Sequence, residues 1–176
     1  MFGDHGLCGL LKEGAHGKSP KCLGGNLGDF GEFCKGLYMF DFFIKNPISI
    51  DEIIEFLASA LGCSSNKILA TTFEKLNDPS FPENDLNEIC CLCIYSKVDG
   101  DASWLVNLYR ISATDDEIRD KIIAVSQLKH IVCYIPNDDF NGYLLTGESE
   151  NPIQVYENED IEEENTYLFN KPISTY

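Results

Sequence analysis

A sharp change in composition at Met39 divides the chain into two unequal segments. Residues 1–38 hold ten of the fourteen glycines and carry no net charge, because their four lysines balance four acids. Glycine at this density raises the entropic cost of ordering the backbone, so no stable helix or strand is expected there. Residues 39–176 carry the whole net charge of −16. We therefore expect a single acidic domain over residues 39–176, preceded by a leader that is either a flexible native arm or extraneous.

The composition of the second segment limits the partners that the protein can use. Nine cations against 25 acids leave too few basic groups for a face that binds nucleic acid, and they disfavour contact with an anionic membrane. No apolar run approaches about 18 residues, and the first residues lack the basic start of a secretory signal. These features predict a folded cytoplasmic domain without nucleic-acid or membrane partners.

A capping box predicts the first of two amphipathic helices, over residues 49–62. The Ser49 hydroxyl can accept a hydrogen bond from the backbone N–H of Glu52, whose carboxylate can reach back to the N–H of Ser49. Isoleucine and leucine then recur at helical spacing, and Gly62 supplies the left-handed residue that ends many helices. The pattern therefore predicts a helix with one apolar face.

A second capping box predicts the other amphipathic helix, over residues 114–129. It starts at Thr114, and the acids that follow lie in the first turn, where they complement the helix dipole. Apolar residues from Ile118 to Leu128 are predicted to share one face. The helix should end near His130, because a positive charge is favourable at a helix C-terminus.

The remaining segments predict an α+β fold with a mainly antiparallel sheet. Apolar runs at 89–97 and 103–111 flank an Asp-Gly turn and indicate a β-hairpin. The two helices do not alternate with strands in repeated β-α-β units, which favours antiparallel pairing. Further strands are predicted over residues 40–44, 68–76, 130–135, 143–146, 153–157 and 167–169.

Cysteine and histidine give little support for a catalytic or metal site. Cys91 and Cys93 lie on one face of a predicted strand without the paired spacing of a zinc site, so we expect them to be buried. His130 is the only histidine after residue 38, and it lies three residues before Cys133, on the opposite face of any strand that contains both. We predict no metal, no cofactor and no enzymatic activity. The alternative is a small enzyme that uses this cysteine and histidine or a pair of carboxylates.

Acidic residues are densest in residues 136–176, where ten acids accompany one cation. Crowded carboxylates steer a basic partner and raise its association rate, while aromatic side chains supply anchors that charge alone does not. The simpler alternative is a solvated tail that serves solubility. The predicted partner contacts are the acids Asp138, Asp139, Glu148, Glu150, Glu157, Glu159 and Asp160, with Trp104, Tyr143 and Tyr156 as anchors.

From Met39 onward, the chain resembles the bacterial immunity proteins encoded beside polymorphic or contact-dependent growth-inhibition toxins. The resemblance rests on a small acidic α+β domain, on the opening run MFDFFI at residues 39–44 and on the acid-rich end. It implies a cytoplasmic, non-catalytic protein that tightly binds one cognate toxin domain, often a nuclease with a basic groove. Such proteins vary widely in contact surface, so no site residue is carried over. A nucleic-acid mimic that binds many basic proteins is the other alternative.

Overall fold

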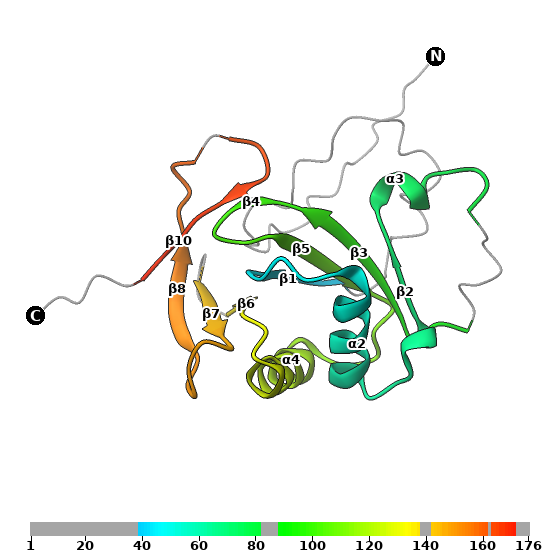
Figure 1. Cartoon of the computed structure of the whole chain (residues 1–176), viewed down its shortest axis with the longest axis horizontal. Coiled ribbons are helices and arrows are strands. Elements are labelled where there is room, and N and C mark those ends of the chain that lie inside the picture. Colours follow the sequence, from blue (N-terminus) through cyan, green and yellow to red (C-terminus); the bar gives the residue numbers. More distant parts are fainter. Residues whose placement is uncertain (1–38, 82–87, 138–141, 162, 172–176) are drawn as a thin grey trace, which may run out of the picture.

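Figure 1 shows the computed structural model, which describes residues 39–81, 88–137, 142–161 and 163–171. The predicted leader lies outside the described residues. Within them the chain is α+β, with three helices and a curled, mostly antiparallel sheet, which confirms the predicted fold class. In chain order the elements are β1 (Met39–Ile44), α2 (Ile50–Leu61), the 3₁₀ turn η1 (Ser65–Lys67), β2 (Ile68–Thr71), α3 (Phe73–Leu76), β3 (Cys91–Lys97), β4 (Asp99–Gly100), β5 (Trp104–Tyr109), α4 (Asp115–Lys129), β6 (Cys133–Pro136), β7 (Gly142–Thr146), β8 (Ile153–Glu157), β9 (Thr166–Tyr167) and β10 (Phe169–Asn170).

Eight strands form the main sheet, in the order β10-β8-β7-β6-β1-β5-β3-β2. Neighbouring strands are antiparallel except β2 and β3, which pair in parallel at one edge. Helix α2 leads from β1 toward β2 and β3, and α4 leads from β5 around β1 to β6. The central strands and helices therefore form two interleaved split β-α-β units, extended on one side by β7, β8 and β10. Both long helices cover the same face of the sheet, below it in Figure 1.

Helix α2 forms as its capping box predicts. Ser49 Oγ accepts from the N–H of Glu52 at 3.2 Å, and Glu52 Oε2 accepts from the N–H of Ser49 at 2.8 Å. Gly62 ends the helix in the left-handed region, with a φ of 66°. The face of α2 that packs against the sheet consists of Ile53, Phe56, Leu57, Ala58 and Ala60.

Helix α4 starts and ends where predicted but has a narrower apolar face. His130 ends it in a left-handed conformation, with its N–H donated to the carbonyl of Ser126. The buried residues of α4 are Ile118, Ile122 and Ser126, whereas Leu128, predicted on the same face, is 78% exposed. At about 100° per residue, Leu128 is turned about 120° from Ile122, the middle of the buried stripe, which places it outside the stripe. The prediction of two amphipathic helices is thus confirmed only in part.

The strand predicted over residues 68–76 is wrong in its second half. The structure divides this segment at Thr72, which caps the short helix α3 and accepts at Oγ1 from the N–H of Lys75 at 3.4 Å. Leu76 at the end of α3 is buried against β3. A hydroxyl that bonds to nearby backbone N–H groups offers the chain an alternative to continued strand pairing.

Strand β1 is buried on both sides and separates two cores. Phe40, Phe42 and Ile44 join the larger core under α2 and α4, where the rings of Phe42 and Phe56 lie 6.1 Å apart. Phe43 points to the opposite face and joins the smaller core. The other buried members of the smaller core are Val98, Ala102, Leu105, Val132, Tyr134, Leu145 and Val155.

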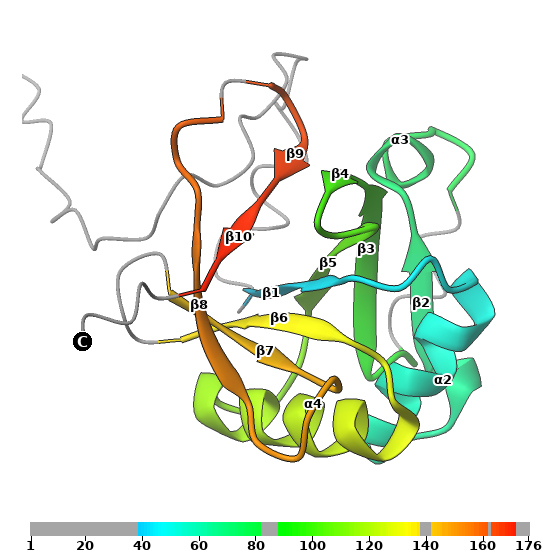
Figure 2. The same cartoon turned by 60° about the vertical axis from the view of Figure 1, so that its left-hand side comes forward.

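The tip of the β3–β5 hairpin holds the C-terminal strands over the smaller core. Strand β4 pairs in parallel with β9, and Figure 2 shows the two side by side. Asp99 donates its N–H to the carbonyl of Asn165 at 2.9 Å. Asp101 donates its N–H to the carbonyl of Tyr167 at 2.8 Å, and its carboxylate accepts from the N–H of Phe169 at 2.8 Å. We call this set of bonds the hairpin clamp.

The single strand predicted over residues 167–169 is wrong as one element. Tyr167 pairs with the hairpin in the small sheet, whereas Phe169 pairs with Glu157 at the edge of the main sheet. Both rings pack on Phe43, with centroids 4.5 Å and 5.5 Å away. The chain therefore changes sheets within this segment while it keeps both rings in the smaller core.

The hairpin clamp requires glycine at position 100. The backbone there has a φ of 94°, which other residues rarely adopt, and an added Cβ would clash with the carbonyl oxygen of Tyr167. We predict that Gly100→Ala lowers the free energy of unfolding by about 2 to 4 kcal/mol. The matched control is Gly62→Ala, where φ is also positive but no atom lies within 4 Å of the added Cβ. The control should lose about 1 kcal/mol. Urea unfolding followed by circular dichroism measures both, and equal losses would contradict the role of the clamp.

Candidate partner-binding surface

The five predicted acidic contacts that the structure describes lie at two ends of strand β8, and Asp138 and Asp139 lie outside the described residues. Glu148 and Glu150 belong to the turn between β7 and β8. Glu157, Glu159 and Asp160 lie at the end of β8 and in the segment that follows it. Figure 2 shows that the first turn lies near α4 and that the second segment lies on the side of β9. The predicted acids therefore form two groups rather than one patch.

The group near α4 is partly engaged by the chain itself. Glu148 Oε1 lies 2.6 Å from Lys45 Nζ, and this hydrogen bond raises the pKa of Lys45 above its ordinary value. The carbonyl of Glu150 accepts from Gln127 Nε2 at 2.8 Å, which ties the turn to α4. Both side chains of the ion pair are well exposed, so the pair contributes less than about 1 kcal/mol to stability.

Glu157 faces the smaller core rather than open solvent. Its Oε2 accepts from the hydroxyl of Tyr143 at 3.3 Å, and its side chain is half-buried. Burial raises the pKa of Tyr143, and the negative charges of Glu157 and Asp41 raise it further. The same three causes raise the pKa of Tyr167. Glu157 is therefore part of an internal cluster of carboxylates and phenols.

The acids beyond Glu157 form an exposed group that we call the acidic rim. The segment between β8 and β9 is closed at its base by a bond of 2.8 Å from the N–H of Asn158 to the carbonyl of Leu168. The hairpin clamp brings Asp99 beside this segment, and residues 158–170 contain no lysine or arginine. The acidic rim consists of the exposed residues Asp99, Glu159, Asp160, Glu163 and Glu164.

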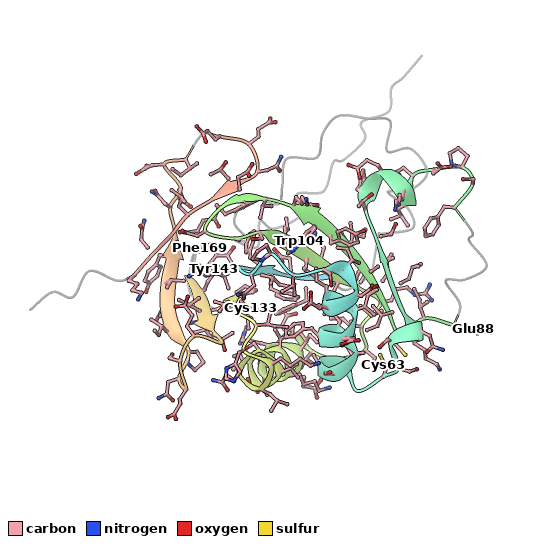
Figure 3. The ribbon with its side chains drawn as sticks, in the orientation of Figure 1. Cys63, Glu88, Trp104, Cys133, Tyr143 and Phe169 are labelled. Atoms are coloured by element: carbon pink, nitrogen blue, oxygen red, sulfur yellow. The ribbon has the colours of Figure 1, made fainter. Side chains whose placement is uncertain are left out.

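Of the three predicted aromatic anchors, two are packed by the chain itself. Trp104 is half-buried, donates its indole N–H to the carbonyl of Ile48 at 3.0 Å and packs edge-on against Tyr95. Tyr143 packs edge-on against Phe169 at 5.1 Å, and Figure 3 shows these two rings together beside β7 and β8. Tyr156 is different, because it is 38% exposed on β8 and lies close in sequence to the acidic rim.

The cysteine and histidine of the alternative enzyme are not brought together. His130 is exposed at the end of α4, whereas Cys133 is fully buried in the larger core, where burial raises the pKa of its thiol. Cys91 and Cys93 are buried in the same core, as predicted. In the described part of the chain, no cluster of metal-ligating side chains is found, and no helix is long and apolar enough to cross a membrane.

Sequence reasoning missed Asp99, Glu163 and Glu164 as members of the surface. Glu163 and Glu164 continue the acidic run that contains Glu159 and Asp160, so the run itself could have indicated them. Asp99 is different, because it joins the rim only through the pairing of β4 with β9. No pattern among the residues near Asp99 in the sequence predicts its pairing with Thr166.

The raised pKa of Tyr143 makes the free energy of unfolding decrease at alkaline pH. A raised pKa means that the folded state keeps the phenol proton after the unfolded state has lost it, so stability falls as the pH rises above about 10. Tyr143→Phe should cost about 1 to 2 kcal/mol at pH 7, through the lost hydrogen bond to Glu157. The difference in the free energy of unfolding between the variant and the wild type should then decrease above about pH 10. Urea unfolding of both proteins from pH 7 to 11 measures this difference, and a difference that stays constant would contradict the role of the Tyr143 proton.

Comparison of the chain with protein-family models, with curated proteins and with solved structures found no match. The acidic rim and the exposed ring of Tyr156 are the features that bear most directly on a partner.

Proposed function

We propose that this chain is a protein inhibitor, an immunity protein that binds and neutralises a cognate bacterial toxin. The observation that carries the proposal is the acidic rim, whose exposed carboxylates stand on backbone held by the hairpin clamp. A surface of this kind suits a partner with a strongly basic surface. A nuclease fits this description best, because its phosphate-binding groove must be basic.

Charge and shape have separate roles in this proposal. The carboxylates of the rim attract the basic groove over a distance of about one Debye length, roughly 8 to 10 Å in physiological salt. They raise the rate of encounter and occupy the positions where phosphates would bind. Because the rim is held at several backbone positions, it would lose little conformational freedom on binding.

Tyr156 is the aromatic anchor that this proposal favours. Its ring is exposed, and its hydroxyl is held by a bond of 2.9 Å from Gln154 Nε2. A tyrosine held in this way offers a large contact area at a low entropic cost. Tyr143 would support the surface from within, through its bond to Glu157, whereas Trp104 packs against the larger core on the other face of the sheet. Glu148 and Glu150 would add a second electrostatic contact at the far end of β8.

The proposal places the protein in the cytoplasm, without a cofactor, a metal or catalytic activity. Five cysteines among the described residues are free thiols, which suits a reducing compartment. An inhibitor that protects the cell from a nuclease also has to act where nucleic acid is present.

The function is tested by co-expression with the product of the neighbouring gene. The C-terminal domain of that product should arrest growth when expressed alone, and this chain should restore growth when expressed with it. The two purified proteins should form a one-to-one complex. Absence of rescue would contradict the proposal, and binding to many unrelated basic proteins would favour the nucleic-acid mimic instead.

The role of the acidic rim is tested by removing three of its charges. The variant is E159Q/D160N/E163Q, and the control E55Q/E88Q/D120N removes the same number of exposed charges elsewhere. Figure 3 shows Glu88 on the opposite side of the molecule from Phe169. With the toxin domain, the rim variant should lower the association rate about tenfold at low salt and weaken its salt dependence. Equal rates for the two variants, measured by stopped flow, would show that the rim is not the contact.

A further inference from the structure

The two edges of the main sheet are protected differently. Strand β10 forms one edge and β2 forms the other, and Figure 1 shows them on opposite sides of the molecule. At the β10 edge, Leu168 accepts from the N–H of Asn158, so the backbone of the next residue, Phe169, faces away from β8. The carboxylate of Asp101 accepts the N–H of Phe169 at 2.8 Å. A carboxylate therefore occupies this outward N–H of β10 and keeps it from a further strand.

Strand β2 turns the backbone groups of Ala70 toward the other edge. The carbonyl of Lys67 accepts from the N–H of Cys90, which directly precedes β3, so the backbone of Lys67 faces β3. Backbone groups alternate in direction along a strand, so those of Ile68 and Ala70 face away from β3. The N–H of Ile68 agrees with this alternation, because it is donated to the carbonyl of Ser65. None of the strands in the described residues lies on that side of β2.

The residues in and around β2 suit pairing with a further strand. The strand reads ILAT at residues 68–71, without the charged residues or proline that commonly protect an edge. The ring of Phe73, two residues further on, is 47% exposed. Within residues 64–81, two lysines balance two acids, although the whole chain has a net charge of −16. The described part of this edge is therefore apolar and carries no net charge.

We infer that the β2 edge binds the β2 edge of a second copy of this chain, in antiparallel pairing about a two-fold axis. With the axis at Ala70, each copy donates the N–H of Ala70 to the Ala70 carbonyl of the other. In this register Lys67 of one copy lies across from Phe73 of the other, beside Glu74. The exposed ammonium of Lys67 thus meets an exposed carboxylate and an exposed ring. This inference is independent of the proposed inhibitor function.

Charge favours a second copy over a basic partner at this edge. A basic partner is attracted to the acidic rim, whereas residues 64–81 have no net charge to attract it. Two copies of a chain with a net charge of −16 repel each other, but salt screens this repulsion beyond a Debye length of about 8 to 10 Å. Contact through β2 keeps the two acidic rims apart, because β10, which follows the rim in the chain, is at the opposite edge.

Sedimentation equilibrium of the full chain tests the inference. A few backbone hydrogen bonds and a small apolar contact predict a weak dimer, with a Kd of about 100 µM. Between about 10 µM and 1 mM, the mean mass in solution should therefore rise from one chain toward two. Over the same range, exchange of the Ala70 amide with deuterated water, followed by NMR, should slow by about fourfold, because it follows the fraction of free chains. A mass of one chain at every concentration would overturn the inference.

A proline at position 70 tests whether the outward N–H makes the contact. Ala70→Pro removes this N–H but leaves the bonds between β2 and β3, and an edge strand tolerates proline where its N–H faces outward. We expect association to weaken by about tenfold or more. The matched control Ala70→Ser keeps the N–H at nearly the same side-chain size, so its Kd should stay within about twofold of wild type. Equal dimer formation by the two variants would place the contact elsewhere and overturn the inference.

Two exposed charges give a test that does not depend on the backbone of β2. Lys67→Glu places carboxylates across from each other in the dimer and should weaken association by about fivefold or more. The exchanged pair K67E/E74K restores opposite charges and should return the Kd to within about twofold of wild type. Circular dichroism checks that both variants fold, as the exposure of Lys67 and Glu74 predicts. An unchanged Kd in Lys67→Glu, or no recovery in K67E/E74K, would overturn the pairing.

Discussion

The burial of β1 on both faces is the constraint on which the rest of the structure depends. This six-residue strand supplies Phe42 to the core under the helices and Phe43 to the core under the hairpin clamp. It also pairs with β5 on one side and β6 on the other, so it joins the two halves of the sheet. A shift of one residue in its register would exchange the two faces and turn Asp41 toward the larger core. Both cores, and through them the position of the acidic rim, therefore depend on a single register.

Acidic residues that cannot be told apart in the sequence have different roles in the folded protein. Glu52 and Glu117 close the capping boxes, and the hydrogen bonds that they accept lower the pKa of each carboxyl. Asp101 holds the N–H of Phe169, and Glu157 accepts from a buried phenol. These groups are engaged in holding the structure together, whereas the acids of the rim are exposed to solvent. The acids behind the net charge of −16 thus include carboxylates that hold the structure together and carboxylates that are exposed on the acidic rim.

Features set by neighbouring residues could be predicted from the sequence, and features set by distant pairing could not. A capping box and a stop residue act within one turn, so the bounds of α2 follow from Ser49 and Gly62 alone. The hydroxyl of Thr72 is an equally local signal, but the apolar spacing around it favours a strand. Trp104 and Tyr143 show a different limit, because large aromatic residues suit cores as well as interfaces. Only the packing of strands that are far apart in the sequence distinguishes the two.

The parallel pairing of β4 with β9 joins Asp99 to Thr166 across much of the domain. Closing so long a loop costs more conformational entropy than closing the β3–β5 hairpin, so we expect this contact to form late in folding. Until it forms, the segment between β8 and β9 has no fixed place beside the hairpin tip. A partly folded chain would then carry the charge of the rim without its shape. Under the proposed function, a basic partner would meet the rim in its folded shape only after β4 and β9 have paired.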